Sequence, residues 1–237
     1  MATEKQPLAL LEETIGYTFN DHALLVEALT HASFANELHA KGAEATCNER
    51  LEFLGDSVLS LAAGSYLYRT FPDLPEGQLS RLRAAIVCKS SLGDYAKTFA
   101  LGDYLRLGHG LELSGGRGQI KILEDAFEAL LGAIYLDGGL APALAFAQPF
   151  LAKKTEEIRA SGTSEDYKTM LQEFVQRRPD DLLEYVLISE SGPDNQKQFT
   201  FEARINGQAY GTGTASSKRA AEQQAARDAL SWFQQTT

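Results

Sequence analysis

The spacing of apolar and polar positions divides the chain into two parts. From residue 7 to about residue 158, apolar residues recur every three or four positions, and segments rich in Gly and Pro separate the runs. This pattern predicts an all-α domain over residues 1–158. The polar, glycine-containing segment 159–165 is typical of a short linker.

After the linker, the period changes to that of strands. An amphipathic segment, an alternating series and an alanine-rich segment follow one another: DYKTMLQEFVQ, then EYVLISE, QFTFEARI and QAYGTGTA, then a helix from about Ser217 to Phe233. Asn206-Gly207 is a strong signal for a two-residue hairpin turn. The order α-β-β-β-α predicts a small α+β domain over residues 166–237, so the fold class is multidomain.

Three acids share one face of a helix that also has a core to cover. In NERLEFLGDSVL, the carboxylates of Glu49, Glu52 and Asp56 fall within an arc of about 60° on a helical wheel, and the leucines, with Leu61 further along, lie on the core side. Like charges at this spacing cost about 0.2–0.5 kcal/mol per pair, and Gly55 costs about 1 kcal/mol more. A sequence that disfavours its own helix marks a candidate functional site.

A second acidic face follows in EDAFEALLGAIYL. Asp125 and Glu128 are three residues apart, and Gly132 comes one turn later. If this face opposes the first one, the carboxylates of Glu52, Asp56, Asp125 and Glu128 converge. Converging acids either take up protons or bind a hard divalent cation such as Mg²⁺ or Mn²⁺, which is the cation that supports phosphodiester hydrolysis. The alternative is that both faces are simply solvated.

Phe53 lies beyond the acids and away from the leucine face. An aromatic side chain outside its own helix's core stripe is either partly exposed or covered by another surface. We expect a contact with a second subunit beside the acids, which predicts a dimer with twofold symmetry. The alternative is a cover formed by loops of the same domain.

The last helix begins with two cations. Lys218 and Arg219 stand in its first turn, where the helix dipole disfavours positive charge by about 0.3–1 kcal/mol. A bound anion would reverse that penalty, and phosphate is the obvious candidate.

The composition limits the class of protein. At 44% hydrophobic, the 237 residues can bury a core, but no run has the roughly 20 apolar residues of a membrane span. The N-terminus lacks a signal-peptide pattern, so we expect a cytoplasmic protein. Cys47 and Cys88 have neither disulfide nor zinc-site spacing, and we expect Cys88 to be a small buried apolar group. The net charge of −10 argues against nucleic acid as a partner, although a local basic patch is sufficient for binding.

NERLEFLGDSVL closely resembles the signature of the bacterial ribonuclease III family, and EDAFEALLGAIYLD resembles that family's second acidic motif. The resemblance extends over essentially the whole chain. It implies an endonuclease domain, a double-stranded-RNA-binding domain and a homodimer. It also implies Mg²⁺-dependent hydrolysis of both strands of an RNA duplex, with Mn²⁺ able to substitute, in the processing of ribosomal RNA precursors and messenger RNA. The products would be 5′-phosphate and 3′-hydroxyl ends with short 3′ overhangs.

The resemblance also implies roles for individual residues. The family's metal ligands fall on Glu52, Asp56, Asp125 and Glu128, of which Asp56 and Glu128 would be catalytic. Its dimer contacts near the active centre fall on Phe53, Glu49 and Glu76.

In the second domain, the resemblance implies RNA contacts at Gln172, Glu173, Asn195, Lys197, Lys218 and Arg219. One departure concerns position 222, where such domains usually have a lysine and this chain has Glu222. Asp194 likewise replaces a residue that is commonly neutral or basic. These acids imply weak, salt-sensitive binding by the second domain alone.

Three rival interpretations stand beside the endonuclease. The first is a ribonuclease III-like RNA-binding protein that no longer cuts, although inactive relatives typically lack one or more of the four acids. The second is a different metal-dependent phosphohydrolase, of the HD type, although the chain has no His-Asp dyad and only the reverse order in Asp21-His22. The third is a structural helical dimer, which leaves the second domain unexplained.

Overall fold

The computed structural model describes residues 7–160, 167–176, 181–193 and 196–236. The chain forms two compact units, Met1–Ser164 and Glu165–Thr237, and each is described here by itself. Within the described ranges, none of the helices combines the length and the apolar character that crossing a bilayer demands.

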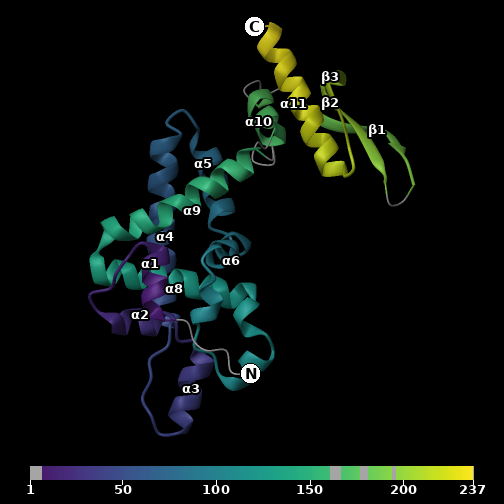
Figure 1. The fold of residues 1–237 in the computed structure, drawn as a ribbon. Coiled ribbons are helices and arrows are strands. Elements are labelled where there is room, and N and C mark those ends of the chain that lie inside the picture. Colours follow the sequence, from purple (N-terminus) through teal and green to yellow (C-terminus); the bar gives the residue numbers. More distant parts are fainter. Residues whose placement is uncertain (1–6, 161–166, 177–180, 194–195, 237) are drawn as a thin grey trace. The chain divides into compact units, whose positions relative to one another are not determined.

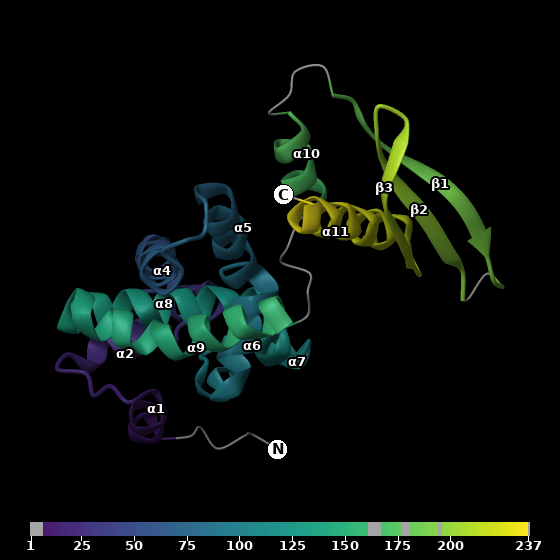
Figure 2. The same ribbon diagram turned by 90° about the horizontal axis from the view of Figure 1, so that it is seen from above.

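The first unit is helical, as the hydrophobic spacing predicts (Figure 1). Its elements are α1 (Leu8–Ile15), α2 (His22–Ala28), α3 (Ala32–Ala40), α4 (Glu49–Thr70), α5 (Glu76–Ile86), α6 (Lys89–Thr98), η1 (Leu101–Tyr104), α7 (His109–Leu113), η2 (Gly116–Gly118), α8 (Ile120–Gly138) and α9 (Leu140–Ala160). Helix α8 is the centre of the unit, with α4, α6 and α9 packed around it (Figure 2). It is buried on all sides over most of its length, which explains why apolar residues fill nearly every turn of it.

A cluster of aromatic rings holds α8 in place. Phe127 is completely buried, and its ring centroid lies 5.5 Å from those of Tyr95, Phe146 and Phe150 and 6.3 Å from that of Phe99. Truncation of such a ring typically costs about 3–5 kcal/mol. Because Phe127 immediately precedes Glu128, this packing also fixes the direction in which the next side chain leaves the helix.

Two glycines let α4 and α8 cross with their backbones in contact. A Cβ atom added to Gly55 would overlap the backbone carbonyl of Glu128, and one added to Gly132 would lie 2.4 Å from the carbonyl oxygen of Leu51. Glycine costs helix stability, and at these two positions it allows an approach that no other residue permits. The crossing brings the acidic face of α4 against that of α8.

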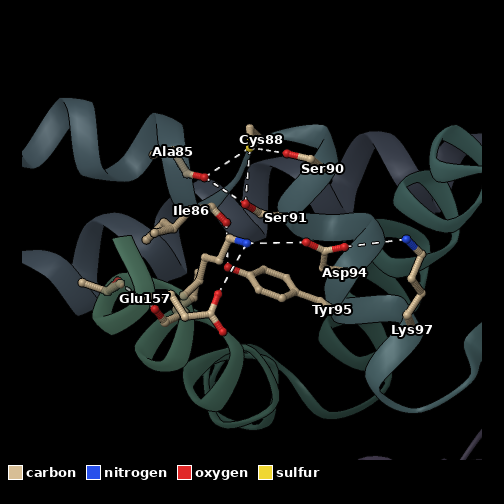
Figure 3. Close-up of polar contacts among 12 residues, drawn as sticks. Ala85, Ile86, Cys88, Ser90, Ser91, Asp94, Tyr95, Lys97 and Glu157 are labelled. Atoms are coloured by element: carbon tan, nitrogen blue, oxygen red, sulfur yellow. Dashed lines mark hydrogen bonds and ion pairs between the residues drawn. The ribbon is translucent and has the colours of Figure 1, made fainter. Parts of the chain in front are cut away.

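The corner between α5 and α6 corrects one expectation. Cys88 is exposed, not buried, and it caps the N-terminus of α6, where its sulfur lies 3.2 Å from the Ala85 carbonyl oxygen and from the Ser90 hydroxyl (Figure 3). Burial of part of the thiol raises its pKa, but hydrogen bonds with Ser90 and Ser91 outweigh that effect, and the pKa of Cys88 is lowered. An apolar run such as AAIVC predicts a helix but does not show where the chain turns, and the turn exposes the thiol.

The second unit has the predicted order of elements. It contains α10 (Tyr167–Val175), β1 (Leu183–Ser191), β2 (Gln198–Ile205), β3 (Gln208–Ala215) and α11 (Lys218–Thr236), with the strands antiparallel in the order β1-β2-β3. Asn206 and Gly207 both have positive φ, 51° and 80°, as a two-residue hairpin requires.

Helix α11 lies directly on strand β3. A Cβ atom at Gly211 would be 2.2 Å from the backbone nitrogen of Ala229, and one at Gly213 would be 2.3 Å from the carbonyl oxygen of Ala221. The facing side chains of α11 are fully buried alanines. The main chains of the helix and the strand are therefore in direct contact, without large side chains between them.

We predict that Gly55→Ala lowers the free energy of unfolding by about 2–4 kcal/mol, because the new methyl group forces α4 away from α8. Gly64→Ala on the same helix is the matched control, since a Cβ atom there meets nothing within 4 Å. The control should be neutral or more stable by up to about 1 kcal/mol. Chemical denaturation measures both, and equal effects of the two substitutions would contradict the proposed contact.

Candidate functional site

Three carboxylates from two helices meet at the α4–α8 crossing. Among the described residues, Glu52 from α4 and Asp125 and Glu128 from α8 each offer an oxygen, and these oxygens all lie within 4.8 Å of one another. Glu128 is buried, with only 8% of its surface exposed, and the side chains of Asp125 and Glu52 are 13% and 28% exposed. The structure thus brings together three of the four acids that the sequence groups.

The electrostatics of this cluster are unfavourable without a cation. Burial, together with the charges of Asp56, Glu124, Glu52 and Asp125, raises the pKa of Glu128 to about 8. Burial and the neighbouring Asp125 also raise the pKa of Glu52. Both shifts mean that the fold holds these carboxylates where the charged form is disfavoured.

Lys121 supplies the one positive charge that touches the group among the described residues. Its Nζ lies 2.5 Å from Oδ1 of Asp125 and 3.8 Å from Oε1 of Glu52, and the hydrogen bond to Asp125 raises its pKa. The side chain is 60% exposed. Sequence reasoning missed Lys121, although its position one turn before Asp125 on α8 is a signal that could have found it.

The donor set fits a hard divalent cation. All three groups that meet are carboxylates, without sulfur or imidazole among them, and oxygen ligands of this kind suit Mg²⁺, Mn²⁺ or Ca²⁺. The raised pKa of Glu128 points the same way, because a bound cation would stabilise the ionised form that the carboxylate cluster by itself disfavours.

Two further acids border the group. Asp56, the fourth acid predicted from the sequence, is exposed on α4 and lies outside the group of three, but its charge acts on Glu128. Glu124, which the sequence reasoning did not select, is 8% exposed and lies 3.8 Å from Nζ of Lys89.

A cavity of about 320 Å³ opens beside the carboxylates. It is lined by His31, Ala32, Asn48, Glu49, Glu52, Lys121 and Asp125. Glu49, predicted near the active centre, is thus part of its wall. Glu76 begins α5, where it accepts a hydrogen bond from the Ser80 hydroxyl, and it does not line this cavity.

An apolar stripe runs along the exposed side of α4. Phe53 is 77% exposed, Tyr68 75% and Leu61 54%. The expectation that Leu61 faces the core is wrong, because it lies at the margin of the apolar arc and α8 covers only the centre of that arc. Exposed apolar side chains at helical spacing on one face indicate a surface that another molecule covers.

The residues predicted to contact RNA are on the surface of the second unit. Gln172 and Glu173 are exposed on α10, and Lys218 and Arg219 are exposed in the first turn of α11, which Ser217 caps. Lys197 forms an ion pair with Glu190 at 3.0 Å. Asn195, like Asp194, lies outside the described residues.

The acid at position 222 has a partner within the unit. Nζ of Lys168 lies 2.6 Å from Oε2 of Glu222. This ion pair offsets the negative charge one turn beyond the two cations of α11.

Comparisons with known proteins agree on both units. A protein-family model described as Ribonuclease-III-like matches residues 21–155, and one described as double-stranded RNA binding motif matches residues 167–232. Ribonuclease 3 of Pelotomaculum thermopropionicum is 47% identical over 97% of this chain and 95% of its own length. Ribonuclease 3 of Oceanobacillus iheyensis is 49% identical over 93% of this chain and 95% of its own length.

A solved structure matches the helical unit. The nuclease domain of ribonuclease III from Campylobacter jejuni, described with structural flexibility in a region involved in dimer formation, superposes with a TM-score of 0.57 at 40% identity. The match covers 62% of this chain and 98% of that one.

We predict that the free energy of unfolding falls as pH rises from about 5 to about 8 when divalent cations are removed. The pKa of Glu128 is about 8 in the folded protein against 4.5 ordinarily, so the folded state binds this proton more tightly than the unfolded state. That stabilisation is complete below pH 4.5 and is lost as pH passes through the folded value.

The melting temperature in EDTA measures the effect. We expect the wild-type melting temperature to fall by roughly 5–10 °C between pH 5 and pH 8, and we expect that of Glu128→Gln not to show this decrease. Glu156→Gln, at an exposed position on α9, should keep the wild-type slope. An unchanged slope in Glu128→Gln would refute the assignment.

Proposed function

The chain belongs to the ribonuclease III family, a family of metal-dependent ribonucleases, and we propose that it is a Mg²⁺-dependent endonuclease that hydrolyses both strands of duplex RNA. The products would be 5′-phosphate and 3′-hydroxyl ends with short 3′ overhangs. Duplex segments of ribosomal RNA precursors and of messenger RNA, in the cytoplasm, are the proposed substrates. The observation that carries the proposal is the cluster of Glu52, Asp125 and Glu128, with the buried Glu128 at its centre.

The acids at the α4–α8 crossing would bind the metal ion and hold it next to the RNA. Glu52, Asp125 and Glu128 would hold Mg²⁺, and Asp56, whose charge already acts on Glu128, would complete the acidic set. The bound ion supplies charge that offsets the charge developing on the attacked phosphate, and it makes water a better nucleophile. Water adds to phosphorus and loses a proton to solvent, the bond between phosphorus and the 3′ oxygen breaks, and that oxygen takes up a proton. One fragment then ends in a 3′-hydroxyl and the other keeps the 5′-phosphate. The crossing of α4 and α8 fixes the acids beforehand, so little reorganisation is needed during the reaction.

Lys121 would also ease the approach of the RNA backbone to the acidic cavity. Its ammonium group partly neutralises Asp125 and Glu52 while the side chain remains 60% exposed. An anionic RNA backbone has to approach an acidic cavity, and a cation at the rim of that cavity lowers the repulsion. A flexible lysine can turn from the carboxylates to a phosphate, because both are anions within the reach of its stem.

The proposed assembly is a homodimer formed through the stripe of Phe53, Leu61 and Tyr68. These exposed side chains lie on the same helix as Glu52, so their burial against a second copy would set two acidic sites near one twofold axis. Two sites would serve two strands. The dimer-forming region of the Campylobacter jejuni nuclease domain supports this proposal. Glu49 and Glu76 would lie beside this interface.

The second unit would hold the duplex. Its family model supports double-stranded RNA as the ligand, and such domains recognise the shape of the duplex and its 2′-hydroxyl groups. Lys218 and Arg219 would contact phosphates, while Gln172 and Glu173 would reach 2′-hydroxyl groups. The loop with Asn195 and Lys197 would enter a minor groove.

We predict that the wild-type protein cuts a long RNA duplex in Mg²⁺ and that Glu128→Gln lowers the rate by at least about 10³-fold, because the substitution removes a carboxylate ligand at the centre of the cluster. The affinity for the duplex should change by less than about threefold, since most of that affinity comes from contacts between cationic side chains and phosphates and not from one carboxylate. Glu156→Gln is the control and should cut at the wild-type rate. Binding without cutting by the wild type would favour the non-catalytic interpretation.

We predict that Phe53→Asp converts the dimer to a monomer at micromolar concentration, because a charged group in the proposed interface would be desolvated. Leu113→Asp is the matched control, since Leu113 is 76% exposed but lies outside the stripe on α4. Gel filtration with light scattering measures both. A monomeric wild type, or a Phe53→Asp variant that stays dimeric, would contradict the interface.

A further inference from the structure

One wall of the acidic cavity is made by a histidine that the proposed mechanism does not use. His31 is the residue before α3 and caps that helix, because its Nδ1 accepts a hydrogen bond from the backbone N–H of Ser33 at 3.1 Å. His31 also lines the cavity, together with Glu52 and Asp125. The residue that caps α3 is therefore also part of the cavity beside the candidate metal site.

The hydrogen bonds around the ring determine where its proton lies. The hydroxyl oxygen of Ser33 accepts a hydrogen bond from the backbone N–H of Gly108 at 2.9 Å, and it is also 2.9 Å from Nδ1 of His31. The contact of Nδ1 with the backbone N–H of Ser33 requires the tautomer in which Nδ1 is an acceptor, and in that tautomer the Ser33 hydroxyl also donates to Nδ1. The ring proton of this tautomer is on Nε2.

The backbone around His31 is held by a distant segment of the chain. The N–H of His31 donates to the carbonyl oxygen of Arg106 at 3.1 Å, and the N–H of Arg106 donates to the carbonyl oxygen of Leu29 at 2.8 Å. The N–H of His109 donates to Oε1 of Glu37 on α3 at 2.6 Å. These bonds hold the backbone on both sides of His31, and the two contacts of Nδ1 with Ser33 orient the ring, so its Nε2–H is a preorganised donor.

Two polar groups on this wall have unused hydrogen-bonding capacity. In the described part of the chain, Nε2 of His31 has no hydrogen-bond partner. Asn48 also lines the cavity, is 97% buried, and its side-chain amide likewise makes no hydrogen bond to a described residue. His31 is half-buried and Asn48 lines the same cavity, so both polar groups are available to a ligand there.

We propose that Nε2–H of His31 donates a hydrogen bond to a phosphate oxygen of the RNA strand bound at the acidic site. The inference rests on the proposed function, which brings a phosphodiester to the carboxylate cluster. An anion beside Glu52 and Asp125 needs hydrogen-bond donors nearby, and His31, Asn48 and Lys121 are donors that line the cavity.

Two substitutions separate this role from capping. In His31→Asn, the short amide oxygen keeps the acceptor for the N–H of Ser33, but the distal donor is lost. In His31→Gln, the longer amide brings an N–H₂ group to the place of Nε2, but the cap on α3 is lost. A merely structural histidine would be replaced better by Asn, and a phosphate donor would be replaced better by Gln.

The experiment measures single-turnover cleavage of a short RNA duplex of defined sequence, with Mg²⁺ saturating, together with the melting temperature and Mg²⁺ affinity by calorimetry. We expect His31→Asn to lower kcat/KM by about 10- to 100-fold, the usual effect of removing a hydrogen bond to a charged group, with unchanged stability and Mg²⁺ affinity. We expect His31→Gln to melt roughly 2–4 °C lower yet to cut within about threefold of the wild type at a temperature where it is folded.

The reverse order of activity, or an His31→Asn variant that cuts as fast as a cleaving wild type, would overturn this inference alone. A wild-type protein that leaves the duplex intact would overturn the proposed function and the inference with it. Loss of Mg²⁺ affinity in His31→Asn would also overturn it, because the residue would then act on the metal site and not on the RNA.

Discussion

The distance between α4 and α8 decides whether the acidic residues form a site or two solvated surfaces. Gly55 and Gly132 let the two backbones touch, and the carboxyl oxygens of Glu52, Asp125 and Glu128 meet within 4.8 Å as a result. The aromatic cluster around Phe127 supports the crossing from the other side of α8. The packing of α4 against α8 therefore also determines the distances between the carboxylates.

The cost of that geometry is electrostatic. Burial disfavours the ionised form of Glu128, and four neighbouring acids add to the effect. Lys121 offsets part of the repulsion with an exposed side chain, which leaves room for a stronger cation. A fold that tolerates unfavourable charges at one place and is well packed everywhere around it is typical of a functional site.

Much of this could be read from the sequence, and the exceptions have physical causes. The acid spacing, the glycines beside the acids and the Asn206-Gly207 turn are local signals, and each has a local structural consequence. Leu61 and Cys88 were misplaced because burial depends on which neighbouring element covers a face. Lys121 was missed although it stands one turn before Asp125, and His31 was missed because its contacts are not local. The hydroxyl beside His31, that of Ser33, accepts from the backbone N–H of Gly108, 75 residues away, and no local pattern in the sequence predicts a hydrogen bond between segments that distant.

The contact between α11 and β3 has a consequence for the recognition of a duplex by its shape. Gly213 meets the backbone of α11 at Ala221, one turn after Lys218 and Arg219, so the height of these cations above the sheet is set by main chain against main chain. Main-chain atoms have no rotamers through which the gap could widen or narrow. An A-form duplex has fixed groove dimensions, and a protein that recognises them by shape needs a spacing that is equally fixed. Because the residues at this contact are small, the backbone fixes the distance between α11 and the sheet. The side chains on the surface do not determine that distance.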